Sequence, residues 1–144
     1  MVVVPDASVI LKWVLQKEEE PNFLAAFQIL EAYQAERIDI RLPSLWRYET
    51  SNILVLKQPT FAEEAMKLLL AYDFPEEALH RDYCLAVIDF MKGIKGVSFY
   101  DAAYHVLALQ VEGTYVTADA RYVEKTHRKS HVRLLSKWSA VSSR

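Results

Sequence analysis

Residues 98–119 read SFYDAAYHVLALQVEGTYVTAD and predict a helix, a tight connection and a short strand that ends on an acid. Ser98 and Asp101 fit a capping box, in which the serine accepts a hydrogen bond from an early backbone N–H. The residues that follow are good helix formers and apolar on most sides, so we expect a largely buried helix that Gly113 stops. Ligands of parallel α/β proteins bind where strands end and helices begin, so Asp101 and Asp119 are both expected at such an edge.

The composition is that of an ordinary globular domain. The 144 residues are 52% hydrophobic and 25% charged, which excludes a disordered chain, and a net charge of −2 provides no general basic field for nucleic acid. The single cysteine, Cys84, cannot form an internal disulfide, which fits a reducing compartment. No charged leader and no apolar run of ~18 residues is present, so we expect a cytoplasmic protein without a membrane span. Without a linker or repeat, residues 1–144 are expected to form a single domain.

The remaining elements alternate between strand and helix. Strands are expected at residues 2–4, 38–42, 115–116 and 132–135, the last at a sheet edge, with a short extended piece within 74–80. Helices are expected at residues 7–15, 18–36, 43–57, 60–72, 82–92 and 121–127, and Thr60 with Glu63 suggests a second capping box. This order favours an α/β fold with a mainly parallel sheet and helices on both faces.

One acid lies on an apolar helix face. At 100° per residue, Glu49 shares its side of the predicted helix with Leu45, Trp46, Asn52, Ile53 and Leu56. A carboxylate in an apolar stripe costs free energy unless a partner binds it, so a paired or functional role is expected. The alternative is that Glu49 lies at the margin of the stripe and reaches water.

Three further acids, Asp6, Asp101 and Asp119, fall at predicted helix starts, where each alone could be a cap worth ~1 kcal/mol. Two like charges ~4 Å apart repel by about 4 kcal/mol at an effective dielectric near 20. If these acids and Glu49 converge, repulsion outweighs capping unless protons or a cation intervene. An all-carboxylate site suits Mg²⁺ or Mn²⁺. Whether the acids converge depends on the tertiary structure.

Four segments carry a family resemblance. VVVPDASVI, RYETSNIL, SFYDAAYHVLAL and TYVTADARYV resemble the four acidic motifs of the PIN-domain nucleases, in the order and spacing of that family. The resemblance implies a PIN-like α/β fold with a short, twisted, mainly parallel sheet flanked by helices. It implies that the catalytic, metal-binding acids are Asp6, Glu49, Asp101 and Asp119. It also implies accompanying polar residues at Ser8, Asn52 and Thr117.

A PIN domain of this size is most similar to the toxin of the VapBC toxin–antitoxin systems. This implies a Mg²⁺- or Mn²⁺-dependent endoribonuclease that hydrolyses RNA phosphodiester bonds as the toxin of a type II pair, with a VapB-like antitoxin and a homodimeric state. Because Mg²⁺ takes only one or two carboxylates directly, Asp6 and Asp101 are expected to bind it directly, and Glu49 and Asp119 directly or through water.

Two alternatives remain open at this stage. The first is a catalytically silent PIN-like domain that binds RNA or protein. The second is another α/β Mg²⁺ protein, but a phosphatase pattern wants an acid where Ser8 stands, and a receiver pattern wants acids adjacent to Asp6.

Basic residues follow the last acid. Phosphate contact is plausible for a cluster that comprises Arg121, Lys125, Arg128, Lys129, Arg133 and Lys137, although such a cluster can equally be a solvated face. Weaker candidates for RNA contact are Lys12 and Arg47. His105, one turn after Asp101, lies either near the acids or, as we expect, on the helix surface. His127 and His131 are weak metal candidates, and Trp13, Trp46 and the tyrosines are expected in the core or a dimer interface.

Overall fold

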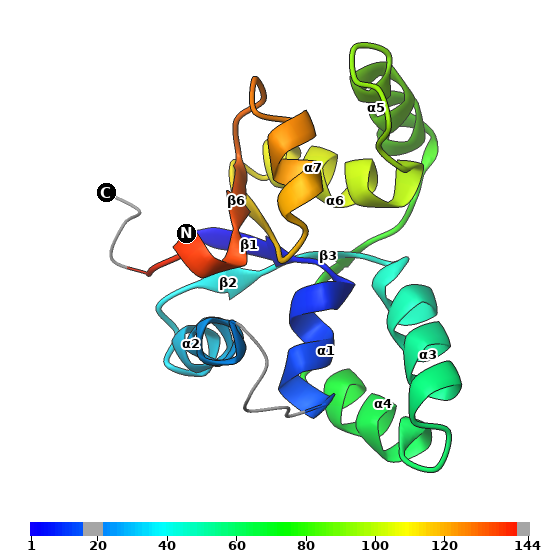
Figure 1. The fold of residues 1–144 in the computed structure, drawn as a ribbon, viewed down its shortest axis with the longest axis vertical. Helices are drawn as coiled ribbons and strands as arrows, with labels where there is room; N and C mark the ends of the chain where they lie inside the picture. Colours follow the sequence, from blue (N-terminus) through cyan, green and yellow to red (C-terminus); the bar gives the residue numbers. More distant parts are fainter. Residues whose placement is uncertain (16–21, 141–144) are drawn as a thin grey trace.

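The computed structural model describes residues 1–15 and 22–140 and shows parallel strands flanked by helices (Figure 1). The strands are β1 (Val2–Pro5), β2 (Asp39–Ile40), β3 (Leu42–Pro43), β4 (Glu76–Glu77), β5 (Thr114–Thr117) and β6 (Val132–Leu134). The helices are α1 (Ala7–Leu15), α2 (Phe23–Gln34), α3 (Trp46–Lys57), α4 (Ala62–Ala71), α5 (Arg81–Met91), α6 (Phe99–Gln110), α7 (Ala120–Lys125) and the 3₁₀ turn η1 (Leu135–Lys137).

The main sheet has the order β2-β1-β5-β6, and all its pairs are parallel. Val4 is opposite Tyr115 in the central pair, and β6 lies at the edge as expected. In Figure 1, α1 and α2 lie below the strands, while α6 and α7 lie above them. Helices on both sides explain why β1 begins with three valines in a row, since both faces of the strand are covered. The predicted α/β fold with a parallel sheet is confirmed.

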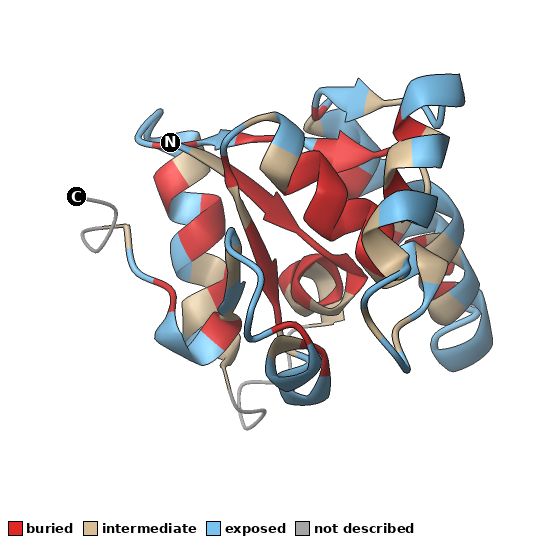
Figure 2. Ribbon diagram, turned by 90° about the horizontal axis from the view of Figure 1, so that it is seen from above, coloured by how far each residue is buried: buried red, intermediate tan, exposed pale blue. Residues whose placement is uncertain are grey.

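The buried residues gather on the central strands and on the helix surfaces turned toward them (Figure 2). Trp13 and Trp46 both belong to this core, where each ring contacts Phe74. The indole N–H of Trp13 also donates to the carbonyl of Ala26, 2.8 Å away, which ties α1 to α2. Among the described residues, no helix is both long and apolar enough to cross a membrane.

Several local predictions were wrong. The single strand expected over 38–42 is two short strands, because β2 pairs with β1 while β3 pairs with β4 in a separate sheet. The Thr60 capping box is absent: α4 begins after Phe61, which makes no side-chain cap. The predicted start of the 18–36 helix lies partly outside the described residues, and α2 is described from Phe23 to Gln34.

Candidate active site

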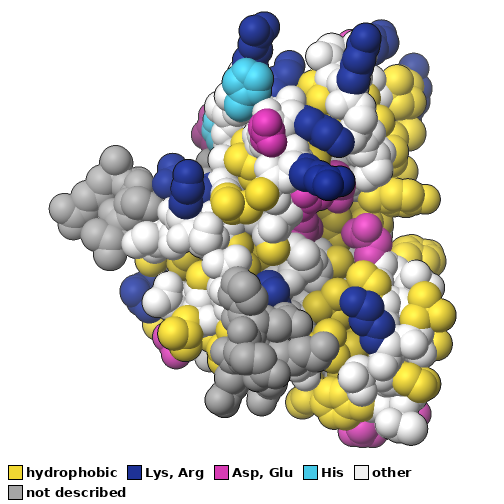
Figure 3. Space-filling model, viewed as in Figure 1, with side chains coloured by type: hydrophobic (Ala, Val, Ile, Leu, Met, Phe, Trp, Pro, Cys, Tyr) yellow, Lys and Arg dark blue, Asp and Glu magenta, His cyan; other side chains and the backbone are white. Residues whose placement is uncertain are grey.

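The four acids reach one place from four separate elements. Asp6 follows β1 and Asp119 follows β5, and these neighbouring parallel strands end at the same sheet edge. Asp101 lies in the first turn of α6 and Glu49 in the first turn of α3. All four line one cavity of about 170 Å³ together with Ala7 and Ser8. In Figure 3, acidic side chains gather in a hollow of the surface, with Lys and Arg side chains above it.

Asp6 is the most deeply buried of these acids, with 6% of its surface exposed. Its Oδ1 accepts hydrogen bonds from the backbone N–H of Ser8, at 3.0 Å, and from the Ser8 hydroxyl. Its Oδ2 accepts from the hydroxyl of Tyr115 at 2.7 Å. Burial raises the pKa of Asp6, and the hydrogen bonds from Ser8, Thr117 and Tyr115 oppose that rise because they favour the charged form.

Glu49 and Asp101 are half-buried. Burial, followed by the charges of Asp101 and Asp6, raises the pKa of Glu49, and a hydrogen bond from the Tyr104 hydroxyl at 2.8 Å opposes this. Burial raises the pKa of Asp101, and the charges of Asp6 and Asp119 add to the effect. Neighbouring acids therefore raise the pKa values of Glu49 and Asp101, as expected for carboxylates that share a site.

The face of α3 differs from the one expected around Glu49. Trp46, Thr50 and Leu54 are its buried residues, whereas Leu56 is 73% exposed. Glu49 sits beside this buried row. It does not lie at the centre of an apolar stripe. Water is not its only partner either, because the Tyr104 hydroxyl donates a hydrogen bond to it.

Asp119 is a cap and a cavity residue at once. Its Oδ1 accepts from the backbone N–H groups of Arg121 and Tyr122, at 3.0 and 3.1 Å, and so caps α7. Asp101 lies at a capped helix start too, where the Ser98 hydroxyl accepts from the Asp101 N–H at 3.1 Å. Helix capping and placement in the cavity are therefore not competing explanations for these acids.

The three accompanying polar residues have different positions. The Ser8 hydroxyl, besides binding Asp6, accepts from the backbone N–H of Ala118 at 3.2 Å, which joins the first turn of α1 to the loop after β5. Thr117 Oγ1 accepts from the Asp119 N–H at 3.1 Å. Asn52 is exposed and lines a different hollow on the outer side of α3, so it does not join the acids.

The basic candidates lie on the surface and do not line the acid cavity. Arg121, Lys125, Arg128 and Lys129 are all exposed. Lys125 donates to the carbonyl of Gly96 at 2.8 Å, and Lys129 lies over the ring of Phe90. Arg47 is paired with Glu76 at 2.6 Å, and Lys12 is partly buried.

His105 was expected on the helix surface, and that prediction was wrong because the residue is fully buried. Its Nδ1 accepts from the hydroxyl of Tyr122 at 2.8 Å and its Nε2 donates to the carbonyl of Ser130 at 2.7 Å, so both ring nitrogens are satisfied. Burial lowers the pKa of His105. The residue therefore acts as a neutral link between α6 and α7. Within residues 1–15 and 22–140, the side chains of His127 and His131 hydrogen-bond to nearby groups, the Glu124 carbonyl and the Ser130 hydroxyl.

Two functional contacts escaped the sequence argument, which treated the tyrosines as core or interface. Tyr104 and Tyr115 are indeed buried, but their hydroxyls donate hydrogen bonds to Glu49 and Asp6. A signal was present, because Tyr104 lies three residues after Asp101 and shares its helix face, and buried tyrosine hydroxyls usually find a partner.

The donor set fits a hard divalent cation, since every candidate ligand is a carboxylate oxygen. Within the described residues, no three His, Cys, Asp or Glu side chains are already arranged closely enough to enclose a metal ion. In proteins, Mg²⁺ keeps several waters and takes few carboxylates directly. A cavity of about 170 Å³ leaves space for such waters.

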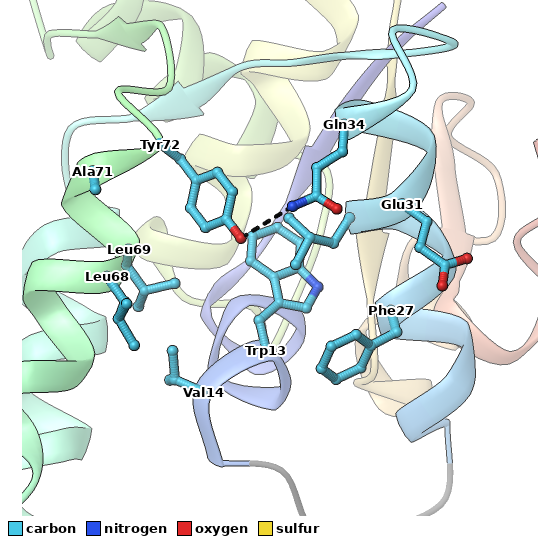
Figure 4. A pocket seen from close by; sticks show the side chains of 10 residues that line it. Trp13, Val14, Phe27, Glu31, Gln34, Leu68, Leu69, Ala71 and Tyr72 are labelled. Atoms are coloured by element: carbon cyan, nitrogen blue, oxygen red, sulfur yellow. Dashed lines mark hydrogen bonds between the residues drawn. The ribbon is translucent and has the colours of Figure 1, made fainter.

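A second, larger hollow has different chemistry. It has a volume of about 550 Å³, lies between α1, α2 and α4, and is lined mostly by apolar side chains such as Trp13 and Phe27 (Figure 4). The amide of Gln34 donates to Tyr72 across its edge at 3.4 Å. It shares no lining residue with the acid cavity.

Solved structures with the same fold include two VapC-related proteins. VapC20 of Mycobacterium tuberculosis, a toxin that cleaves the sarcin–ricin loop, is 12% identical over 81% of this chain and 87% of its own, with a TM-score of 0.59. VapBC2 of Rickettsia felis, bound to a DNA fragment from its promoter, is 12% identical over 93% of this chain and 97% of its own, with a TM-score of 0.64.

PAE2754 from Pyrobaculum aerophilum is 22% identical over 94% of this chain and 92% of its own, with a TM-score of 0.62. No curated protein matches the chain in sequence. At these identities the likeness shows the fold, and the sequence itself supplies the family. The PIN-domain profile matches residues 3–128, which include all four acids, and the chain therefore belongs to the PIN-domain family.

Proposed function

We propose that this protein is a divalent-metal-dependent endoribonuclease that hydrolyses RNA phosphodiester bonds, with Asp6, Glu49, Asp101 and Asp119 as the metal-binding acids. The observation that carries the proposal is their convergence on one cavity. Membership of a family whose members are typically nucleases supports it. The alternative phosphatase and receiver functions have no support in the family match.

The residues of the chain have separable tasks in this proposal. Asp6 and Asp101 bind the ion directly, and Glu49 and Asp119 bind it directly or through water. Ser8 and Thr117 orient Asp6 through hydrogen bonds. When bound, Mg²⁺ or Mn²⁺ supplies Lewis-acid chemistry, polarising a phosphodiester oxygen and making a water more acidic. The exposed basic residues, which include Arg121, contact the RNA phosphates.

The proposed biological role is the toxin of a type II toxin–antitoxin pair, acting in the cytoplasm as a homodimer of single-domain chains. Its proposed partner is a VapB-like antitoxin. The shared fold with a VapC toxin and with a VapBC assembly supports this role. Expression of the chain alone should arrest growth, and expression of the Asp6→Asn/Asp101→Asn variant should not.

Metal binding to the folded protein tests the site directly. Mn²⁺ at 100 times its Kd should stabilise the wild type by about 2.7 kcal/mol, because the ion binds only the folded acid cluster. The Asp6→Asn/Asp101→Asn variant should lose both this thermal shift and Mn²⁺-dependent cleavage of structured and unstructured RNA. The matched control is Asp82→Asn/Asp89→Asn, which removes two exposed charges from α5 and should keep both responses.

An unchanged Mn²⁺ response in the Asp6→Asn/Asp101→Asn variant would contradict the assigned site. A normal metal response without cleavage of any RNA would favour the catalytically silent domain instead.

A further inference from the structure

Two buried tyrosines donate hydrogen bonds to two of the acids. The hydroxyl of Tyr104, on α6, donates to Glu49 Oε1 at 2.8 Å, and that of Tyr115, on β5, donates to Asp6 Oδ2 at 2.7 Å. Each contact joins elements that are far apart in the chain, since the partners are 55 and 109 positions apart. The tyrosines therefore bind α3 and the end of β1 to the elements that carry Asp101 and Asp119.

The two rings hold each other in place. Tyr104 and Tyr115 are stacked, with ring centroids 5.8 Å apart and planes 14° from parallel. The ring of Tyr115 also packs edge-on against Tyr122 and lies beside His105. Both side chains are almost fully buried, so neither hydroxyl can move away without disturbing the core.

Both hydroxyls remain donors. A phenol has a pKa of about 10 and so keeps its proton at neutral pH. A protonated phenol has a single O–H to donate, whereas each carboxylate oxygen has about two acceptor positions. Ser8 occupies both acceptor positions of Asp6 Oδ1 through its N–H and its hydroxyl, and Tyr115 occupies one position of Oδ2, so the position for another ligand lies on Oδ2.

We propose that Tyr104 and Tyr115 are positioning residues of the metal site, each holding one acid in the orientation that presents its remaining oxygen positions to the cation. This inference rests on the proposed function. Outer hydrogen-bond partners of metal ligands typically contribute 10- to 100-fold to metal affinity. The tyrosines have this role although they are not among the four acids of the motifs.

Titration calorimetry of Mn²⁺ without RNA tests the proposal. Tyr104→Phe and Tyr115→Phe each remove one oxygen and leave the ring packing in place. Each should raise the Mn²⁺ Kd by about 10-fold. The matched control is Tyr83→Phe, which also removes a buried hydroxyl, but one that donates to the Ala103 carbonyl at 2.5 Å. Its Kd should stay within about twofold of the wild type, since the hydroxyl touches no acid.

Metal dependence of RNA cleavage separates positioning from a structural role. In the phenylalanine variants, the half-saturating Mn²⁺ concentration should rise about 10-fold while the rate at saturating Mn²⁺ recovers. A lower saturating rate with an unchanged half-saturating concentration would indicate a structural role and overturn the proposal. Metal-free thermal melts check the folding of each variant. If one variant does not fold, the Mn²⁺ affinity of the other variant tests the proposal.

The test also distinguishes this inference from the proposed function. If the wild type binds Mn²⁺ and both phenylalanine variants bind it equally tightly, only the positioning role is lost. If the wild type binds no Mn²⁺, the metal site itself is rejected and the positioning role with it.

Discussion

Asp101 carries a charge that its surroundings oppose. Burial raises its pKa first, and the charges of Asp6 and Asp119 raise it further. The folded protein therefore holds a proton on Asp101 more tightly than the unfolded chain does. That stabilisation is complete below the unfolded pKa and is lost as the pH rises through the raised folded pKa. A bound cation would reverse the balance at neutral pH, because it favours the ionised acid.

The Asp101→Asn variant should therefore gain stability over the wild type as the pH rises from about 4 to about 8 without metal. Because the cavity is open to solvent, screening limits the expected gain at neutral pH to about 1 kcal/mol. This corresponds to about 3 °C in Tm for a domain of this size. Thermal melts in EDTA across this pH range measure it.

Asp89→Asn serves as the control, because Asp89 is an exposed acid on α5, and this variant should follow the wild type. A Tm difference for Asp101→Asn that stays constant across the pH range would contradict the account of charge repulsion.

At the scale of elements, the close approach of β1 and β5 sets the geometry of the acid edge. Gly113 immediately precedes β5 and is buried against β1, where a Cβ would lie 2.6 Å from the carbonyl oxygen of Val2. The left-handed residue after α6 is Glu112, with φ 53°, so Gly113 does not stop the helix by its own φ. It is needed instead because only a residue without a side chain fits between the two strands.

Gly113→Ala should destabilise the protein by about 1–3 kcal/mol, because the added methyl forces the two strands apart. It should also weaken the Mn²⁺ response, since Asp6 and Asp119 follow these strands. Gly93→Ala is a matched control, as a Cβ there meets nothing within 4 Å. Urea unfolding measures both changes, and equal stability of the two variants would show that the backbone contact is unimportant.

For the whole molecule, the distribution of charge matters more than its total. The net charge is −2, yet Lys and Arg side chains cluster above the acidic hollow (Figure 3). A polyanion on this face would lie against positive charge beside the carboxylates. Binding of RNA should then depend on local phosphate contacts, which release counterions, without any general attraction.

Removing two of the positive charges proposed to contact RNA should reduce the salt dependence of RNA binding. For Arg121→Gln/Arg128→Gln, the slope of log Kobs against log salt should fall by about 1.4 for single-stranded RNA, at about 0.7 per phosphate contact. Fluorescence anisotropy in EDTA prevents cleavage during the measurement.

Arg37→Gln/Lys57→Gln is the control, since it changes the net charge equally through exposed residues on other elements. Equal slopes in the two double variants would contradict the assigned RNA face.

The sequence by itself determined the order of the main strands and helices and the membership of the PIN family. The elements follow from local periodicity, and the family follows from the resemblance of four short acidic motifs and from the profile match. The run of valines in β1 and the capped start of α6 needed no distant partner to be recognised.

Only the tertiary structure decided which side chains meet. The pairing of Tyr115 with Asp6, the burial of His105 against Tyr122 and the division of residues 38–42 between two sheets all depend on partners far along the chain. No local pattern encodes such a partner, because a buried tyrosine or histidine is satisfied by whatever acceptor or donor the packing brings within hydrogen-bond distance.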